Sequence, residues 1–227
     1  MARVVIIGGH GKVALRLAPL LRARGDEVTS VIRNPDHAAD VEEAGASPLV
    51  ADVETMSVDA LAEILAGHDA VVWAAGAGGG DAARTYAVDR DAAIRSMDAA
   101  ERAGVHRYVM VSYIGAGPDH GTPEDSSFFP YAEAKSAADA HLRSSRLEWT
   151  VLGPGGLTLD EPTGRIAVRD PGDGRVSRGD VAAVIAASLV EQATVRRTIR
   201  FGNGDEPIED ALRLKVESDE WGAPPTP

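Results

Sequence analysis

The chain has 227 residues, of which 44% are hydrophobic and 26% charged, a balance that suits a globular protein with a sizeable core. Its net charge of −12 argues against nucleic acid and anionic membrane surfaces as partners, because both would repel it. The lack of cysteine excludes disulfides, thiolate nucleophiles and cysteine metal sites. The sequence opens directly with MARVVIIGG and has no apolar run of about 18 residues, so we expect a cytoplasmic protein.

Apolar runs and helical patterns alternate from the first residues onward. The expected strands are residues 3–7, 27–32, 48–51, 70–73, 108–111 and 149–152. The expected helices are one that ends at Gly25, then residues 35–44, 58–65, 84–103 and 131–144, with a loop over residues 115–130. This alternation predicts an α/β fold with a doubly wound parallel sheet.

The pattern loosens after Gly153. Residues 166–168 and 175–177 are expected to form a small hairpin around the turn sequence PGDG. A helix over 180–189, a strand over 198–201 and a short helix over 208–212 are expected to follow. Residues 215–227 form the tail, whose last part, WGAPPTP, should fray. No repeat or long linker divides the sequence, so we expect a single domain over residues 1–227.

The first strand runs into the glycine-rich stretch GGHGKVA and then into a helix. Gly8, Gly11 and Ala14 lie three residues apart, and glycine lets backbone N–H groups approach a pyrophosphate at a helix N-terminus. The alternative is an ordinary strand-to-helix turn without a ligand. The position at the first such junction favours a dinucleotide site, in which His10 makes a backbone-filling or capping contact. The expected contacts in this loop are Gly8, Gly9, His10, Gly11, Lys12 and Val13.

The end of the second strand bears on the choice of cofactor. NAD sites usually have a carboxylate there for the ribose 2′-hydroxyl, whereas NADP sites need a cation for the 2′-phosphate. Asp26 and Glu27 come too early, and Arg33 stands at the strand end. NADP(H) is therefore the preferred cofactor and NAD(H) the alternative. Lys12 is a second candidate cation, although either side chain could simply be solvated.

Two further segments fit the same site. Asp52, followed by Val53, comes after the third strand, where its carboxylate could bind the adenine amino group or merely precede a turn. Small residues follow the fourth strand and leave room for the ribose and nicotinamide, although such a run also suits a mobile loop. The candidates there are Ala74, Ala75 and Gly76.

The stretch YAEAK places Tyr131 and Lys135 four residues apart, on one face of the expected helix. With four tyrosines and three lysines in 227 residues, chance gives such a pair with an expectation of about 0.05. The pair is either a proton-transfer site or an exposed helix pair without chemistry.

In this order along the chain, these stretches resemble the atypical short-chain dehydrogenases/reductases, and within them the NmrA-like, NAD(P)H-binding group that includes epimerase/dehydratase-like proteins. The resemblance rests on VVIIGGHGKVA near the start, VIRNP at 31–35, AAERAGVHRYVMVS at 99–112, YAEAKSAADAHLRSSRLEWTVLGPGGLT at 131–158 and VSRGDVAAVIAASL at 176–189. It implies a Rossmann-like sheet of strand order 3-2-1-4-5-6-7, with residues 153–214 forming the substrate side.

The resemblance also implies the roles of the catalytic residues. Tyr131 would exchange the proton as hydride moves, and Lys135 would bind the nicotinamide ribose and lower the tyrosine pKa from about 10. The substrate-orienting serine of this superfamily falls at Ser112-Tyr113 here. Either Ser112 takes that role, or Tyr113 replaces it, or the role is absent.

The resemblance assigns two further positions. Asp89 stands where extended members often have asparagine. The backbone of Pro154, Gly155 and Gly156 would contact the nicotinamide carboxamide.

These features predict an NADP-dependent oxidoreductase that reduces a small carbonyl-like substrate. One alternative is a non-catalytic NADP(H)-binding redox sensor, which the missing serine pair favours. Another is an epimerase or dehydratase that regenerates its bound cofactor. We expect no metal site, because the histidines lack metal-ligand spacing. A small molecule is the expected partner, without nucleic acid or membrane, and the chain is expected to be a monomer or homodimer.

Overall fold

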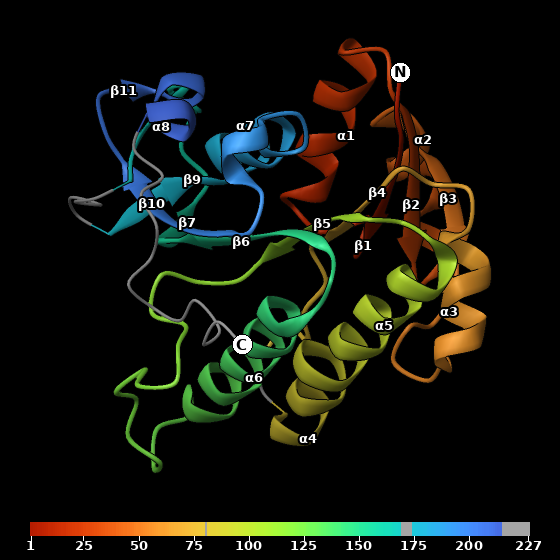
Figure 1. The fold of residues 1–227 in the computed structure, drawn as a ribbon, viewed down its shortest axis with the longest axis horizontal. Coiled ribbons are helices and arrows are strands. Elements are labelled where there is room, and N and C mark those ends of the chain that lie inside the picture. The colour runs from red at the N-terminus through yellow and green to blue at the C-terminus, as the bar shows by residue number, and fades with distance from the viewer. Residues whose placement is uncertain (80, 169–173, 215–227) are drawn as a thin grey trace.

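The computed structural model describes residues 1–79, 81–168 and 174–214. They include a nine-stranded sheet of order β11-β8-β10-β6-β5-β4-β1-β2-β3 (Figure 1). The strands of this sheet are β1 (Arg3–Ile7), β2 (Glu27–Ile32), β3 (Ser47–Val50), β4 (Ala70–Trp73), β5 (Arg107–Val111), β6 (Glu148–Pro154), β8 (Arg165–Ala167), β10 (Arg197–Asn203) and β11 (Glu206–Pro207). Strands β3-β2-β1-β4-β5-β6-β10 pair in parallel. The expected order 3-2-1-4-5-6-7 is confirmed, with β10 in the seventh place.

The central position of β1 explains its composition. Residues 4–7 are all buried, because helices cover both faces of the sheet and leave no solvent side for a polar residue. Ile7 lies opposite Val31 of β2 and Trp73 of β4. The carboxyl ends of these three strands therefore lie together, at the edge where open α/β sheets bind ligands.

The helices form one layer on each face of the sheet (Figure 1). One layer contains α1 (Ala14–Ala23), α2 (Ala38–Glu43) and α7 (Arg178–Ser188), and the other contains α3 (Val58–Leu65), α5 (Ala93–Ala103) and α6 (Phe129–Ser144). Each layer has its own apolar core, with Leu17 and Val184 in the first and Leu61 and Met97 in the second. These two cores hold the sheet rigid beneath the site.

The helix expected over residues 84–103 begins earlier and changes its pitch. The Asp81 side chain accepts hydrogen bonds from the Ala83 and Arg84 backbone N–H groups and so caps α4 (Ala82–Thr85). The chain continues as the π-helix η2 (Tyr86–Ala92) before α5 begins. Such wide turns are frequent at functional sites. Here the π-helix buries the carboxyl of Asp89.

The hairpin expected from residues 166–168 and 175–177 is wrong. β8 pairs antiparallel with β10 and β11, whereas β9 (Arg175–Ser177) pairs in parallel with β7 (Gly156–Thr158). Most of the PGDG turn lies outside the described residues. The pairing differs because β10 ends the run of parallel strands with an open edge, and β8 satisfies the backbone groups of that edge.

The remaining elements are the 3₁₀ turns η1 (Pro35–His37) and η3 (Gln192–Thr194) and the helix α8 (Ile208–Leu214). Among the described residues, no helix is long and apolar enough to cross a membrane.

Candidate cofactor and substrate site

The glycine loop joins β1 to α1, and close approach to neighbouring strands requires its glycines. Gly8 has φ +88°, and a Cβ there would lie 2.6 Å from the Ala75 Cα. A Cβ on Gly9 would lie 2.4 Å from the Ser30 Cβ of β2. The loop therefore packs directly against β2 and the residues that follow β4.

The start of α1 suits a bound anion. Val13 stands at the N-cap without a side-chain hydrogen bond, and the first turn contains no acidic residue. The first N–H groups of a helix lack partners within the helix and carry partial positive charge. The loop and helix end thus fit a pyrophosphate, the group for which such junctions are built.

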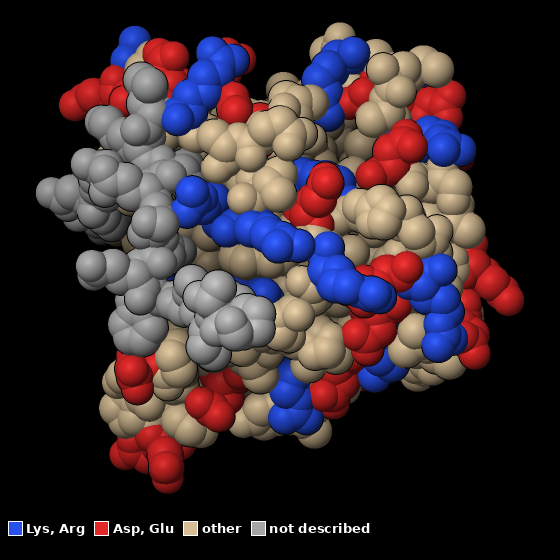
Figure 2. All heavy atoms as spheres, viewed as in Figure 1, with Lys and Arg blue, Asp and Glu red and all other residues tan. Residues whose placement is uncertain are grey.

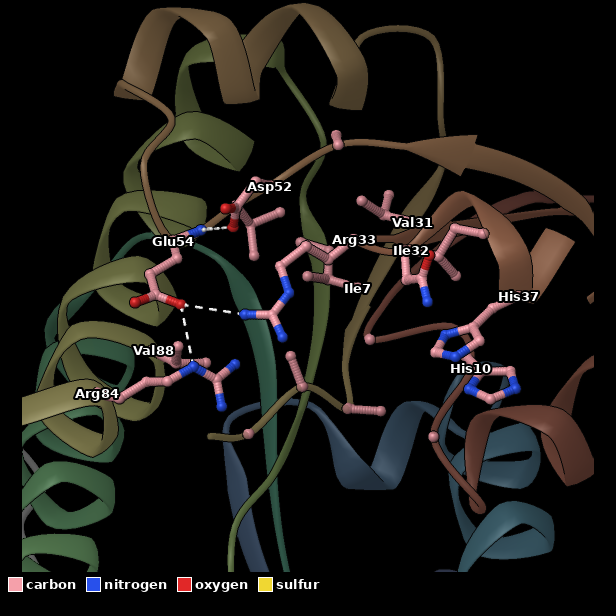
Figure 3. A pocket seen from close by; sticks show the side chains of 18 residues that line it. Ile7, His10, Val31, Ile32, Arg33, His37, Asp52, Glu54, Arg84 and Val88 are labelled. Carbon is pink, nitrogen blue, oxygen red and sulfur yellow. Dashed lines mark hydrogen bonds and ion pairs between the residues drawn. The ribbon is translucent and has the colours of Figure 1, made fainter. Parts of the chain in front are cut away.

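A cavity of about 310 Å³ opens beside this loop (Figure 3). The expected residues that line it are Gly8, His10, Gly11, Arg33, Asp52, Val53, Ala74, Ala75 and Gly76. Expected cofactor contacts outside this lining are Gly9, Lys12, Val13, Ser112, Tyr131, Lys135, Pro154, Gly155 and Gly156. The cavity is also lined by residues that sequence reasoning missed, among them His37, Glu54, Arg84 and Val88.

Arg33 extends across this cavity from the end of β2 toward Glu54 (Figure 3). Its Nη1 lies 3.6 Å from the Glu54 Oε2, and the Arg84 Nε lies 3.3 Å from the same oxygen. The Glu54 carboxylate therefore forms ion pairs with both guanidinium groups. The Arg33 side chain is nevertheless 57% exposed. Asp52, beside them, accepts a hydrogen bond from the Glu54 backbone N–H at 3.1 Å, which fixes the turn after β3.

Two histidines form another part of the cavity wall. The rings of His10 and His37 stack with their centroids 3.6 Å apart (Figure 3). The His10 Nε2 lies 2.7 Å from Asp40 of α2. The side chain of His10 is thus held in place, which goes beyond the backbone-filling role expected for it.

On α6, Asp139 follows Lys135 at the same spacing of four residues that separates Lys135 from Tyr131. Lys135 is buried, and its Nζ donates a hydrogen bond to the Val111 carbonyl at the end of β5 at 2.7 Å. Asp139 is also buried and accepts a 2.6 Å hydrogen bond from the Ser112 hydroxyl. The face of α6 that carries the expected catalytic pair is therefore tied to the carboxyl end of β5.

The hydrogen bond to Asp139 answers part of the question about the serine. The Ser112 hydroxyl is buried and gives its hydrogen to that carboxylate. Tyr113 is half-buried and turns toward the aromatic residues near α6, with its ring centroid 5.5 Å from that of Tyr131. In this geometry Ser112 joins β5 to α6, while Tyr113 supports Tyr131.

The electrostatics of Tyr131 differ from the expectation. Burial raises its pKa, and the carboxylates of Asp89 and Asp139 raise it further. Lys135 is itself a buried cation, and burial lowers its pKa despite the two carboxylates. The expected lowering of the tyrosine pKa is therefore wrong for this structure, because burial of the phenol and the nearby carboxylates all act to raise it.

Asp89 connects this face of α6 with the loop after β4. Its Oδ2 accepts a hydrogen bond from the Ala77 backbone N–H at 2.9 Å, and a Cβ on Gly76 would lie 3.0 Å from its Oδ1. Burial raises the Asp89 pKa, while Lys135 and the Ala77 N–H lower it. The π-helix thus places a carboxyl group between the cofactor cavity and Tyr131.

A second cavity, of about 760 Å³, lies beside Tyr131. The loop before α6 lines it with residues 124–128, and α6 adds Pro130 and Tyr131. The opposite wall is formed by Gly79, Asp81, Ala82 and Thr85. Residues 74–79 and 81–88, the shared segment, therefore contribute to both cavities.

The backbone of residues 154–156, at the end of β6, is already hydrogen-bonded. The Gly155 N–H donates to the Phe201 carbonyl and the Gly156 N–H to the Gly174 carbonyl. The Pro154 carbonyl accepts from the Ile114 N–H.

Some of the missed residues left a signal in the sequence. Asp139 continues the spacing of four from Tyr131 and Lys135, and extending that count would have found it. Glu54 and Arg84 lie 30 residues apart and meet only through the fold. No spacing rule could have paired them.

The glycine loop, the cavity at the carboxyl ends of parallel strands and the anion-ready helix end define a dinucleotide-binding protein with a Rossmann-like fold. A family profile described as NAD(P)H-binding matches residues 8–192, and the chain belongs to this family. The expected resemblance to an NAD(P)H-binding, epimerase/dehydratase-like group is thereby confirmed.

Relatives share nearly the whole chain. The uncharacterized sugar epimerase YhfK of Bacillus subtilis is 36% identical over 93% of this chain and 99% of its own length. The UPF0659 protein YMR090W of Saccharomyces cerevisiae is 35% identical, over 93% of this chain and 97% of its own length. A solved structure from Bacillus halodurans, of a candidate NAD-dependent epimerase/dehydratase, is 34% identical with a TM-score of 0.85, over 93% of this chain and 99% of that one.

Proposed function

We propose that the protein is an NAD(P)H-dependent reductase of small carbonyl compounds in which Tyr131 donates the proton. The observation that carries this proposal is the position of Tyr131. It lines a cavity of substrate size that shares a wall segment with the cofactor cavity. Carbonyl reduction needs the hydride donor and the proton donor to reach the same carbonyl group, so the nicotinamide would extend past this segment to the cavity beside Tyr131.

The residues of the first cavity suit the parts of a dinucleotide. The glycine loop and the start of α1 would hold the pyrophosphate, and Asp52 would face the adenine. We assign the ribose 2′-phosphate to Arg33, and NADP(H) is then preferred over NAD(H). Ala74, Ala75 and Gly76 leave room for the nicotinamide half, and the bound cofactor supplies the hydride.

Tyr131 acts as an acid in this proposal. Its raised pKa keeps the phenol protonated at neutral pH, so the hydroxyl is ready to donate to a carbonyl oxygen. The reverse reaction would need the phenolate, which burial and the two carboxylates disfavour. Lys135 and the Ser112–Asp139 pair position α6 against β5.

The test is single-turnover oxidation of bound NADPH across a panel of aldehydes, ketones and quinones. Tyr131→Phe should lower the rate by about 10²–10⁴-fold, the usual contribution of a proton donor, without weakening NADPH binding. Tyr86→Phe is the matched control, since Tyr86 lines neither cavity and lies under the Arg90 guanidinium. The wild-type rate should stay level from about pH 7 to pH 9, because a raised pKa keeps the tyrosine protonated there.

Full activity in Tyr131→Phe would remove the tyrosine from the mechanism. A rate that falls through neutral pH as the tyrosine ionises would contradict the proton-donor state. NADPH binding without turnover on any substrate of the panel would count against a reductase and favour a redox sensor. Conversion of a hydroxylated substrate to its epimer, without net cofactor oxidation, would favour an epimerase.

A further inference from the structure

The cavity beside Tyr131 has the size of a small-molecule site, at about 760 Å³. If the proposed reductase function holds, this cavity receives the carbonyl substrate. Its lining can therefore be read for the chemical class of that substrate.

Aromatic rings form one part of this lining. Phe128 and Tyr131 both line the cavity, with ring centroids 5.1 Å apart. Tyr113 packs against both of them, at 5.3 Å from Phe128 and 5.5 Å from Tyr131. Phe128 is nevertheless 45% exposed, which is unusual for a large apolar side chain with aromatic neighbours. These rings offer an apolar surface whose faces attract cations.

The charged groups of the lining are all acidic. Asp81, Glu124 and Asp125 line the cavity, and its lining among the described residues contains no lysine, arginine or histidine. Asp81 is committed to the N-terminus of α4, where it caps two backbone N–H groups. Glu124 and Asp125 are exposed and form no ion pair with a described residue. Their charge is therefore available to a ligand.

The surrounding surface has the same sign. The loop that joins β5 to α6 contains Asp119, Glu124 and Asp125 and no lysine or arginine. Figure 2 shows acidic and uncharged side chains over the projection at the lower left, where Figure 1 places this loop. A cavity lined by one sign of charge raises the local concentration of ligands with the opposite sign.

We propose that the substrate is a carbonyl compound that carries a positive charge on an aromatic or alkyl body. The cationic group lies against Phe128 near Glu124 and Asp125, and the carbonyl oxygen faces the Tyr131 hydroxyl. Phosphorylated or carboxylated substrates, including nucleotide sugars, would meet carboxylates and no basic group among the described residues that line this cavity.

The reaction balances without a further reagent. The hydride of NAD(P)H bonds to the carbonyl carbon while the π electrons of the carbonyl move to its oxygen. That oxygen takes the proton of the Tyr131 hydroxyl, and Tyr131 regains a proton from water. The products are the alcohol and NAD(P)⁺, and the cationic group is unchanged.

The experiment compares three aryl ketones that differ only in charge. They are the para-acetyl derivatives of benzoate and of N,N,N-trimethylanilinium, with acetophenone as the neutral member. Binding to the protein saturated with NADP⁺ is measured by calorimetry, and reduction by NADPH is measured separately. The cation should bind about tenfold more tightly than the neutral ketone, and the anion more weakly than either. The preference should shrink at high salt, because exposed charges are screened.

Variants locate the source of the preference. Glu124→Gln combined with Asp125→Asn should reduce the preference for the cation to about twofold, the part that the aromatic faces supply. Asp119→Asn, on the same loop but outside the cavity lining, should leave the preference unchanged. Neither substitution alters a residue of the proposed proton-transfer site.

The possible failures can be told apart. Equal binding of the three ketones, or tighter binding of the anion, would overturn the assignment of a cationic substrate even if all three were reduced. A charge preference that survives the double substitution would also overturn it. Binding in the expected order without reduction would support recognition of a cation and count against the reductase.

Discussion

Arg33 has a partner, Glu54, that would compete with the proposed 2′-phosphate. Its guanidinium lies 3.6 Å from Glu54 and shares that carboxylate with Arg84. A phosphate group offers more charge and a bidentate hydrogen-bonding geometry, so it should displace a single carboxylate from arginine. Glu54 then acts against the binding of a 2′-phosphate, and removing its charge should favour NADPH.

Two substitutions with opposite signs test this assignment. Arg33→Ala should weaken NADPH binding by about tenfold or more and change NADH binding by less than about twofold, since only NADPH has the 2′-phosphate. Glu54→Gln should strengthen NADPH binding relative to NADH. Both affinities are measured by cofactor fluorescence, with Arg146→Ala, whose side chain is 90% exposed, as control. Equal losses for both cofactors in Arg33→Ala would contradict the role.

At the residue scale, the sequence predicts which side chains share a helix face better than it predicts how deeply each of them is buried. The spacing of four correctly placed Tyr131 and Lys135 on one helix face, because helix geometry is local. It could not predict that Lys135 would be fully buried and Tyr131 partly buried. Burial reverses the expected pKa shift of the tyrosine, and burial is decided by how α6 packs against η2 and β5.

At the scale of elements, the glycine loop is the feature whose sequence says most about its structure. Gly8, Gly11 and Ala14 predicted the turn, and the loop forms where expected. The closest contact, however, belongs to Gly9, whose absent Cβ leaves room for Ser30. A spacing pattern does not reveal this contact, because it depends on the register of β2 against β1.

Gly9→Ala should therefore destabilise the loop more than the motif alone suggests. An added Cβ would lie 2.4 Å from the Ser30 Cβ, so β2 or the loop must shift, at a cost of about 1–3 kcal/mol in the free energy of unfolding. Denaturant unfolding measures this loss, and cofactor affinity should fall with it. Ser30→Gly in the same chain should recover part of both.

Gly117→Ala is the control, since its Cβ would come no closer than 4.0 Å to the Arg200 guanidinium. A loss of the same size at Gly117 would mean that the effect is not steric.

The wrong hairpin shows the limit of local patterns at this scale. Residues 166–168 and 175–177 lie near each other in sequence around a turn signal, yet each pairs with a strand from elsewhere. Strand pairing depends on which edges are open in the finished sheet. The order of the parallel strands was implied by the family resemblance, whereas the alternation of strands and helices predicted only that the sheet would be parallel and doubly wound.

At the scale of the whole molecule, negative charges outnumber positive ones. The net charge is −12 and the sequence pI about 4.9, so the chain repels itself at neutral pH. Burial also raises the pKa of Asp89 and Asp139, so these groups hold protons more tightly in the folded state. The resulting stability is full below the unfolded pKa of about 3.9 and is lost as pH rises through the folded pKa.

Lys135 acts in the opposite direction. Burial lowers its pKa, so a penalty develops as pH falls from the unfolded value of about 10.4 to the lower folded one. We expect the two carboxyl groups and the net charge to outweigh this single lysine.

Moderate acidification should therefore stabilise the protein. The Tm should rise by about 2–4 °C at low salt as the pH is lowered from 8 toward the raised pKa values of Asp89 and Asp139, which corresponds to roughly 1 kcal/mol for a chain of this size. About 0.5 M sodium chloride should reduce the difference, because it screens the repulsion between surface charges. Thermal unfolding followed by circular dichroism checks both points, and a Tm that falls over this range would contradict this account.

The shared segment, residues 74–79 and 81–88, has a consequence for how two ligands would bind. Within this segment, Ala74, Ala75, Gly76 and Arg84 line the first cavity, whereas Asp81 and Thr85 line the second. A ligand that shifts this segment on one side changes the shape offered to a ligand on the other. The two affinities are then coupled, and coupling between binding sites is reciprocal. The free energy by which bound cofactor improves substrate binding therefore equals the free energy by which bound substrate improves cofactor binding.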